Sequence, residues 1–210
     1  MLCAVLLAAG ESKRMGSLKA LLPLFFEESG ESKGKDTFLS FILKNLHSVC
    51  EETILVLGYK ADLIENKIVD LNLKTKIIIN REYKKGQLCS LRVNIKKVSP
   101  DCEGIMLTLV DHPLVNKKTY RLLKEKFSRE KDKIIIPAYK GKWGHPVIFS
   151  SLFFPDLMKA PLNQGARYVV KSYSEKITLL PVEDKGVILN IDTPENYQKF
   201  CSYTSLKRLH

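Results

Sequence analysis

The sequence predicts an α/β fold of three layers, in which helices cover both faces of a mostly parallel central sheet. Two observations predict it. Strand-like and helix-like runs alternate along the chain, and the strand-like runs are apolar throughout, as at residues 53–57 and 105–110. Parallel strands that are covered on both faces are continuously apolar, whereas strands of a half-exposed sheet alternate. We expect the crossovers between these strands to be right-handed.

The elements follow one another in a regular order. We expect strand and helix pairs at residues 3–7 and 37–49, 53–57 and 61–71, and 76–79 and 90–97. The helical runs carry apolar residues at helical spacing, for example Ile64 and Ile68, so one face of each helix should be buried. A last helix begins at Pro194, with Thr193 suited to its N-cap, and ends near Cys201.

Length and composition indicate one globular domain. The chain has 210 residues, of which 45% are hydrophobic and 27% charged, and we place the domain at residues 1–202. Residues 27–35 are too polar to fold alone, so we expect a mobile surface loop there. Asp36 is placed to cap the helix that follows. The basic tail at residues 203–210 is expected to be frayed.

Several classes of protein are disfavoured. No apolar run approaches the ~18 residues that span a bilayer, so no membrane contact is expected. The five cysteines lack the spacing of a zinc site or a disulfide framework, which favours the reducing cytoplasm. The net charge of +11 would attract polyanions, although a lysine-rich proteome would produce the same charge. The positive residues are dispersed, so nucleic acid is not an expected partner.

A loop rich in small residues follows the first strand. Residues 7–16 read LAAGESKRMG, and Lys19 comes shortly after. Small residues let the backbone approach a ligand, successive amides form an anion-binding concavity, and Arg14 and Lys19 add positive charge. The loop therefore indicates a phosphate cradle, and the alternative is an ordinary turn with solvated basic residues. Its spacing matches neither the dinucleotide-binding nor the P-loop motif.

Two acidic residues follow apolar runs. Asp111 comes directly after residues 105–110, and Asp192 follows a strand expected at residues 187–189. Open α/β sheets bind ligands at the carboxyl ends of their strands, and two converging carboxylates would hold Mg²⁺ through hard oxygen ligands. Either residue could instead be an ordinary turn residue.

These features, taken together with three further motifs, resemble the MobA-like nucleotidyltransferases, and specifically their molybdenum cofactor cytidylyltransferase branch. The motifs follow the order of the family over nearly the whole chain, at residues 7–19, 86–92, 110–113, 137–146, 165–167 and 190–195. The resemblance implies a Rossmann-like, GT-A-like nucleotidyltransferase fold. It also implies Mg²⁺-dependent transfer of CMP from CTP to the phosphate of molybdenum cofactor, with release of pyrophosphate. A molybdoenzyme that receives the product is then an expected partner.

The resemblance supports roles for individual residues. Those expected in catalysis are Arg14, Lys19 and Asp111, and those expected to hold the metal are Asp111 and Asp192. Those expected to bind the nucleotide are Leu7, Ala8, Ala9, Gly10, Gly58, Asn80 and Ser90. Those expected to bind the acceptor are His145 and Arg167.

The expected chemistry rests on alignment and charge neutralisation. A phosphate monoester with a second pKa near ~6 is largely dianionic at neutral pH, so the acceptor needs no dedicated general base. Arg14 and Lys19 would stabilise the charge on the leaving pyrophosphate. The LAAG loop of this chain resembles that of the cytidylyl branch, whereas guanylyl relatives usually have LAGG at the same place. The methyl group of Ala9 would therefore leave less room for a purine.

Three positions depart from the pattern of the branch. His112 stands where Gln is common, Gln87 where Met is usual, and residues 163–164 where Asp often precedes the Gly-Ala-Arg motif. Since these departures concern the acceptor, two alternatives stay open. One is a CTP- or UTP-dependent transferase that acts on a sugar or polyol phosphate. The other is a non-catalytic accessory protein that binds the cofactor for a molybdoenzyme.

Overall fold

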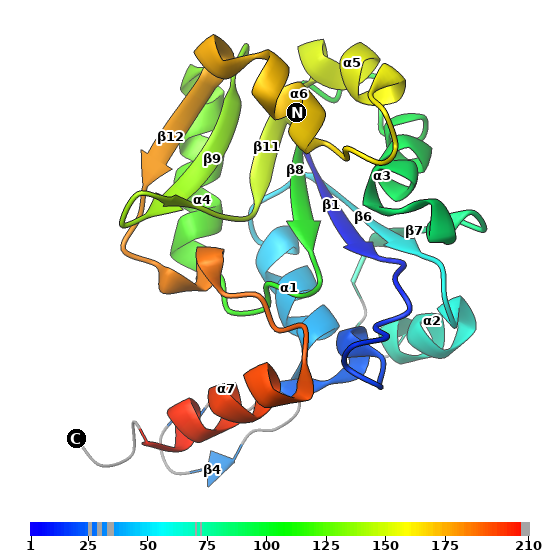
Figure 1. The fold of residues 1–210 in the computed structure, drawn as a ribbon, viewed down its shortest axis with the longest axis vertical. Helices are drawn as coiled ribbons and strands as arrows, with labels where there is room; N and C mark the ends of the chain where they lie inside the picture. Colours follow the sequence, from blue (N-terminus) through cyan, green and yellow to red (C-terminus); the bar gives the residue numbers. More distant parts are fainter. Residues whose placement is uncertain (25–26, 29–30, 33–35, 70, 72, 207–210) are drawn as a thin grey trace.

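The central sheet has the strand order β10-β9-β11-β8-β1-β6-β7, and β12 also pairs with β9 (Figure 1). The structure is a computed structural model, and it describes residues 1–24, 27–28, 31–32, 36–69, 71 and 73–206. Its strands are β1 (Leu2–Ala8), β6 (Glu52–Leu57), β7 (Thr75–Ile79), β8 (Gly104–Leu109), β9 (Ile134–Tyr139), β10 (Lys142–Trp143), β11 (Val147–Ser150) and β12 (Ile177–Pro181). Among the described strands of this sheet, β10 and β11 pair antiparallel with their neighbours and the other pairings are parallel. The predicted mostly parallel sheet is confirmed.

Helices cover both faces of this sheet. On one face lie α1 (Phe38–His47), α2 (Ala61–Val69) and α4 (Lys117–Arg129), and on the other lie α3 (Gln87–Ile95), α5 (Phe154–Lys159) and α6 (Arg167–Ser172). The last helix, α7 (Pro194–Leu206), packs through Phe200 beyond the carboxyl ends of the strands, as Figure 1 shows. Short 3-10 helices are η1 (Lys19–Leu21), η2 (Tyr83–Lys85), η3 (Ser151–Phe153), η4 (Ser174–Lys176) and η5 (Lys185–Ile188). The three predicted layers are present.

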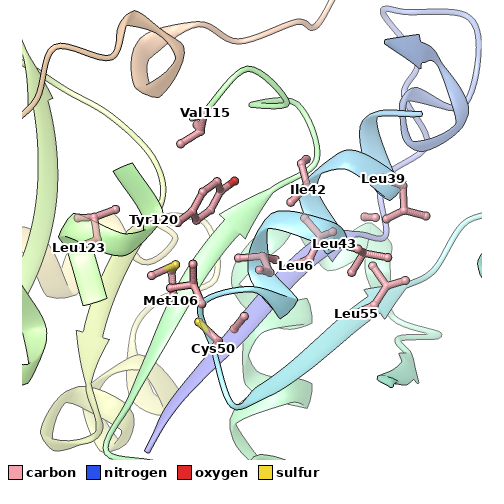
Figure 2. Close-up of a cluster of buried hydrophobic side chains, with 14 of the residues drawn as sticks. Leu6, Leu39, Ile42, Leu43, Cys50, Leu55, Met106, Val115, Tyr120 and Leu123 are labelled. Carbon is pink, nitrogen blue, oxygen red and sulfur yellow. The ribbon is translucent and has the colours of Figure 1, made fainter. Parts of the chain in front are cut away.

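The apolar character of β1 follows from its two buried faces. Successive side chains of a strand point to opposite faces, and here Leu6 enters the cluster beneath α1 and α4, whereas Val5 and Leu7 enter the cluster beneath α3. Figure 2 shows the first cluster, in which Leu6 lies near Ile42 of α1 and Tyr120 of α4. Every residue of β1 is therefore buried.

The register of the strands brings their carboxyl ends to one edge of the sheet. Leu7 of β1 is paired with Leu109 of β8, and Ala8 is paired with Leu57 of β6. The residues that follow these strands, which include Ala9 and Asp111, must therefore lie side by side. This edge carries the candidate site described below.

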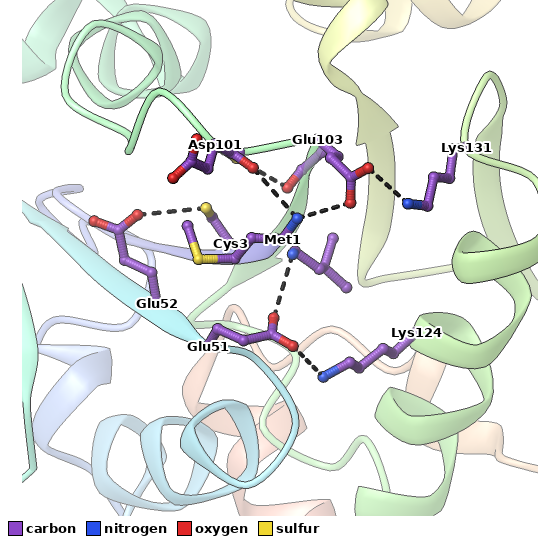
Figure 3. A network of polar contacts seen from close by, with 11 residues as sticks. Met1, Cys3, Glu51, Glu52, Asp101, Glu103, Lys124 and Lys131 are labelled. Atoms are coloured by element: carbon purple, nitrogen blue, oxygen red, sulfur yellow. Dashed lines mark hydrogen bonds and ion pairs between the residues drawn. The ribbon is translucent and has the colours of Figure 1, made fainter.

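A polar network closes the opposite edge, where the same strands begin (Figure 3). The amino group of Met1 lies 2.7 Å from Glu103, which also pairs with Lys131. The carboxylate of Glu51 accepts a hydrogen bond from the amide of Leu2 over 3.2 Å. These contacts fix the starts of β1, β6 and β8 relative to one another.

Two local predictions were wrong. Residues 187–189 do not form a strand, because η5 turns through Val187 and the backbone then reaches Asp192 without regular secondary structure. The N-cap of α1 is Thr37 and not Asp36. The hydroxyl of Thr37 accepts from the amide of Ser40 over 3.1 Å, and Asp36 instead accepts from the hydroxyl of Ser40 over 2.7 Å. The hydroxyl of Ser40 also accepts from the amide of Thr37, which completes a capping box.

The last helix begins as predicted and ends later. Thr193 caps it, because its hydroxyl accepts from the amide of Asn196 over 3.3 Å. The helix passes the predicted end near Cys201 and continues to Leu206, so the tail expected at residues 203–210 begins as helix, and residues 207–210 lie outside the described residues.

The predicted mobile loop at residues 27–35 contains two short paired strands, β3 (Glu27–Glu28) and β4 (Glu31–Ser32). Its other residues lie outside the described residues, and its mobility stays a prediction. The flanking strands β2 (Pro23–Leu24) and β5 (Asp36–Thr37) pair antiparallel and lead into α1. Within the described part of the chain, no helix combines the length and the apolar character that crossing a membrane requires.

Candidate active site

Two acidic side chains converge beyond the carboxyl end of β8. Asp111 follows the strand closely, and Asp192 lies in the irregular segment before α7. The backbone joins them, because the amide of Ile191 donates a hydrogen bond to the carbonyl oxygen of Asp111 over 2.8 Å. Both carboxylates are largely buried, with 12% and 14% of their side-chain surfaces exposed. The structure therefore brings together the two acids that the sequence singled out.

Two basic side chains from the loop after β1 reach this acid pair. The ammonium of Lys19 lies 3.6 Å from Oδ2 of Asp111 and forms a closer ion pair with Oδ1 of Asp192. The guanidinium of Arg14 lies 2.8 Å from Oδ2 of Asp192. Burial raises the pKa of Asp192, but the hydrogen bond from Lys19 and the charges of Lys19 and Arg14 outweigh burial, so this pKa lies below its ordinary value. The four charged residues form one cluster.

The basic loop is held in shape by its own backbone. The amides of Met15 and Gly16 donate to the carbonyl of Ser12 over 2.9 and 3.1 Å, and the hydroxyl of Ser12 accepts from the amide of Lys19 over 3.3 Å. Gly16 has a φ of 71°, a left-handed conformation that glycine adopts without steric cost. The side chain of Met15 is buried in the same cluster as Ile191. The basic loop and the segment before α7 are therefore anchored in the same hydrophobic cluster.

A cavity of about 200 Å³ opens beside the charged cluster. It lies at the carboxyl ends of β1 and β8, between the loop after β1 and the start of α3. The predicted site residues that line it are Leu7, Ala8, Ala9, Gly10, Lys19, Ser90 and Asp111. The other residues that line it are Ser12, Leu18, Ala20, Ile64, Tyr83, Gly86, Gln87, Leu109 and Val110. Its wall combines apolar side chains with polar and charged groups, and such polar groups fix the orientation of a ligand in a small-molecule site.

Two predicted nucleotide residues lie outside the lining of this cavity. Gly58 packs closely beneath the loop, since a Cβ there would lie 2.7 Å from Cβ of Tyr83 and 2.8 Å from the carbonyl oxygen of Ala9. Asn80 is buried, and its amide donates to the hydroxyl oxygen of Ser90 over 3.0 Å. Asn80 thereby holds Ser90 at the cavity wall. Direct contact of Gly58 or Asn80 with a nucleotide stays a prediction.

Sequence reasoning missed part of the wall that faces α3. Tyr83 lies in η2, and Gln87 is the first residue of α3, three positions before Ser90. Residues three apart in a helix share a face, so Gln87 could have been placed beside Ser90 from its spacing. Tyr83 lies in an irregular segment, where no periodicity marks it. The departure at Gln87 therefore falls on the cavity that the LAAG loop lines.

The two predicted acceptor residues differ in exposure. His145 is largely buried, its amide donates to the carbonyl of Val187 over 2.9 Å, and its ring centroid lies 4.9 Å from that of His112. Burial, followed by the nearby His112, lowers the pKa of His145 to about 4, so its imidazole is neutral at pH 7. Arg167 lies at the start of α6 and is exposed, and its charge also lowers the pKa of His145. Through His112, the acceptor residues adjoin Asp111.

The acidic pair fits a divalent cation. Oδ1 of Asp111 is buried and has no hydrogen-bond partner among the described residues, and such an oxygen is costly to bury unless a ligand or ion satisfies it. Within the described ranges, no group of three or more His, Cys, Asp or Glu side chains could hold a metal by itself. The protein therefore offers two carboxylates, and phosphate oxygens and water would complete the coordination of a hard cation.

Comparison with known proteins identifies the family. Residues 4–177 match the model of the MobA-like NTP transferase domain. The chain belongs to this family. It is therefore a nucleotidyltransferase, which confirms the predicted class of enzyme. Asp192 lies beyond the matched residues, so its place in the site of this MobA-like domain rests on the contacts given above.

One relative and two crystal structures illustrate what this MobA-like chain is similar to. It is 30% identical over 196 residues, 92% of each chain, to the molybdenum cofactor cytidylyltransferase of Escherichia coli (strain K12). The crystal structure of Rv0371c from Mycobacterium tuberculosis H37Rv has a TM-score of 0.79 at 28% identity, and covers 96% of this chain and 98% of that chain. A manganese complex of Rv0371c has a TM-score of 0.72 at 27% identity over the same shares of the two chains. Divalent-metal dependence is typical of this class of enzyme.

Proposed function

We propose that this nucleotidyltransferase transfers CMP from CTP to the terminal phosphate of molybdenum cofactor, uses Mg²⁺ and releases pyrophosphate. The observation that carries the proposal is the cluster of Asp111, Asp192, Lys19 and Arg14 beside a cavity lined by the LAAG loop. Such a cluster offers acidic ligands for a cation and basic partners for phosphates at one place. The molybdenum cofactor cytidylyltransferase of E. coli, at 30% identity, supports the choice of nucleotide and acceptor.

The chemistry follows from these charges. An oxygen of the acceptor phosphate attacks the α-phosphorus of CTP, and the bond from that phosphorus to the bridging oxygen breaks, so pyrophosphate leaves with the electron pair. Asp111 and Asp192 would hold Mg²⁺, which neutralises charge on the phosphate oxygens when bound. Lys19 and Arg14 stabilise the charge that gathers on the pyrophosphate. The acceptor phosphate is already largely dianionic at neutral pH, with a second pKa of ~6, so no side chain needs to remove a proton.

The cavity supports a pyrimidine nucleotide. Ala9 lines the wall and is buried, so its methyl group occupies space that a glycine would leave open. In contrast, a Cβ at Gly10 would meet no atom within 4 Å, which leaves the backbone there accessible to a ligand. The methyl group at Ala9 and the open space at Gly10 together favour a small base that lies against the backbone.

The position of His112 supports a second class of acceptor as a candidate. This departure from the branch lies between Asp111 and the largely buried ring of His145, so it falls where an acceptor phosphate would approach the metal. A CTP- or UTP-dependent transferase for a sugar or polyol phosphate is therefore the second candidate. We also propose a cytoplasmic location, since the spacing of the cysteines is not that of a disulfide framework, and a molybdoenzyme as the recipient of the product.

A direct assay tests these proposals. The protein is incubated with Mg²⁺, each of the four nucleoside triphosphates and either molybdenum cofactor or a panel of sugar and polyol phosphates, and products are identified by mass. We expect the cytosine dinucleotide of the cofactor and pyrophosphate with CTP. Product with a sugar or polyol phosphate alone would favour the second candidate. Cofactor binding without turnover under every condition would favour the non-catalytic alternative.

A further inference from the structure

The ammonium group of Lys19 lies at the place where the two carboxylates converge. It pairs with Oδ2 of Asp111 and with Oδ1 of Asp192, and the three side chains have 13%, 12% and 14% of their surfaces exposed. Arg14 reaches Oδ2 of Asp192 from solvent, with 73% of its side chain exposed. Lys19 therefore offsets part of the negative charge of the acid pair from within the protein.

A divalent cation and Lys19 would compete for these carboxylates. Both are attracted to the same oxygens, and two cations close together in a largely buried site repel each other strongly. Oδ1 of Asp111 has no hydrogen-bond partner among the described residues, so the lysine leaves one ligand oxygen available. The lysine thus weakens binding of a metal that arrives alone, without closing the site to it.

We propose that the ammonium of Lys19 occupies the place of the metal ion between Asp111 and Asp192, and that it moves from these carboxylates to the phosphates when the nucleotide binds. This rests on the proposed function, because the triphosphate provides the new partner. Phosphate oxygens attract Lys19 and Arg14 away from the carboxylates, and Asp111 and Asp192 then become available to the metal. Metal and nucleotide therefore bind cooperatively, and linkage requires each to strengthen the binding of the other by the same factor. Lys19 couples the two ligands in addition to stabilising the leaving group.

Metal binding without nucleotide tests the exchange. Mn²⁺ is titrated into the full chain by calorimetry and by electron paramagnetic resonance, for wild type, Lys19→Met, Lys19→Arg and Lys13→Met. Lys13 is a matched control, because it belongs to the same loop, carries the same charge and pairs with Glu11 at 2.9 Å instead of with the acid pair. We expect Lys19→Met to bind free Mn²⁺ about 5- to 100-fold more tightly than wild type, the usual range of coupling between two sites. Lys19→Arg keeps the charge and should remain close to wild type, as should Lys13→Met.

Three outcomes would overturn the exchange. One is a Lys19→Met protein, shown to be folded by its thermal unfolding, whose affinity for free Mn²⁺ equals that of wild type. Another is an equal gain in Lys13→Met, which would reflect general charge and not the position of Lys19. If Lys19→Met does not fold, the decisive measurement is wild type with and without a non-hydrolysable CTP analogue, and an unchanged Mn²⁺ affinity would contradict the proposal. Failure of the proposed transfer reaction would instead appear in the product assay and leave the free-metal comparison intact.

Discussion

The backbone amide of Ile191 donates a hydrogen bond to the carbonyl oxygen of Asp111 over 2.8 Å. This bond joins the segment after β8 to the segment before α7, so the backbone itself places Asp192 beside Asp111. The side chain of Ile191 is buried with Met15 of the basic loop. Acids and bases of the site therefore share a fixed frame before any ligand binds, as preorganised electrostatic catalysis requires.

Asp111→Asn should abolish transfer while the fold is kept. The amide is nearly the same size as the carboxylate but is a much weaker ligand for a hard cation, and we expect turnover to fall by roughly 100-fold or more. Pyrophosphate release measures turnover, and circular dichroism measures the fold. Asp101→Asn is the control, because Asp101 is exposed at the opposite edge of the sheet. Near-normal turnover in Asp111→Asn would remove the metal assignment.

Ala9→Gly should relax discrimination against GTP. Removal of one methyl group from the cavity wall makes room for a larger base, and we expect the ratio of kcat/KM for CTP to that for GTP to fall by roughly 10-fold. Ala20→Gly removes a methyl group from another part of the same wall and serves as the matched control. An unchanged ratio in Ala9→Gly would refute the role of that methyl, and an equal change in both variants would assign selectivity to cavity size alone.

Strand ends could be predicted because continuous apolar runs define them. Residues 105–110 nearly match β8, and the register then brings Asp111 beside the loop after β1. The strand predicted at residues 187–189 was wrong, because a short apolar run does not distinguish a strand from other buried backbone. Here Val187 is buried and its carbonyl accepts from the amide of His145. The hydrogen bond of Asn80 to Ser90 and the position of Tyr83 depend on tertiary contacts, which no local pattern records.

Asp184→Ala should destabilise the domain strongly. This buried carboxylate accepts from the amide of Asn116 over 2.8 Å, the hydroxyl of Thr119 over 2.6 Å and the amide of Gly186 over 2.9 Å. It thereby joins the start of α4 to a distant segment and fixes η5, which leads towards the acid pair. Loss of a buried carboxylate that accepts three hydrogen bonds should lower the free energy of unfolding by about 3 kcal/mol, measured in urea.

Asp132→Ala is the matched control for this change, because the ion pair of Asp132 with Lys176 is half-exposed. Exposed pairs contribute little, so its free energy of unfolding should stay close to that of wild type. An Asp184→Ala protein as stable as Asp132→Ala would show that the three hydrogen bonds add nothing to stability.

Acid should destabilise the protein through His145. Burial, with the nearby His112 and Arg167, lowers the pKa of His145 from 6.5 to about 4. The unfolded chain then binds more protons than the folded protein between these values, so stability falls as pH decreases from about 6.5 to about 4. At 1.36 kcal/mol per pH unit the full loss is about 3 kcal/mol. Urea unfolding at pH 7 and pH 4.5 should show a smaller loss for His145→Gln than for wild type, and parallel losses would contradict the assignment.

Gln87→Met should weaken nucleotide binding more than acceptor binding. The resemblance to the cytidylyltransferase branch connects this departure with the acceptor, but Gln87 lines the same cavity as Ala9 and Ser90. A side-chain amide in that wall can donate and accept hydrogen bonds, and loss of one or two such bonds corresponds to a rise of roughly 3- to 10-fold in KM for CTP, with little change in kcat. Gln164→Met, at an exposed position before α6, controls for the substitution itself. A rise in KM for the acceptor alone would instead place the acceptor, and not the base of the nucleotide, against Gln87.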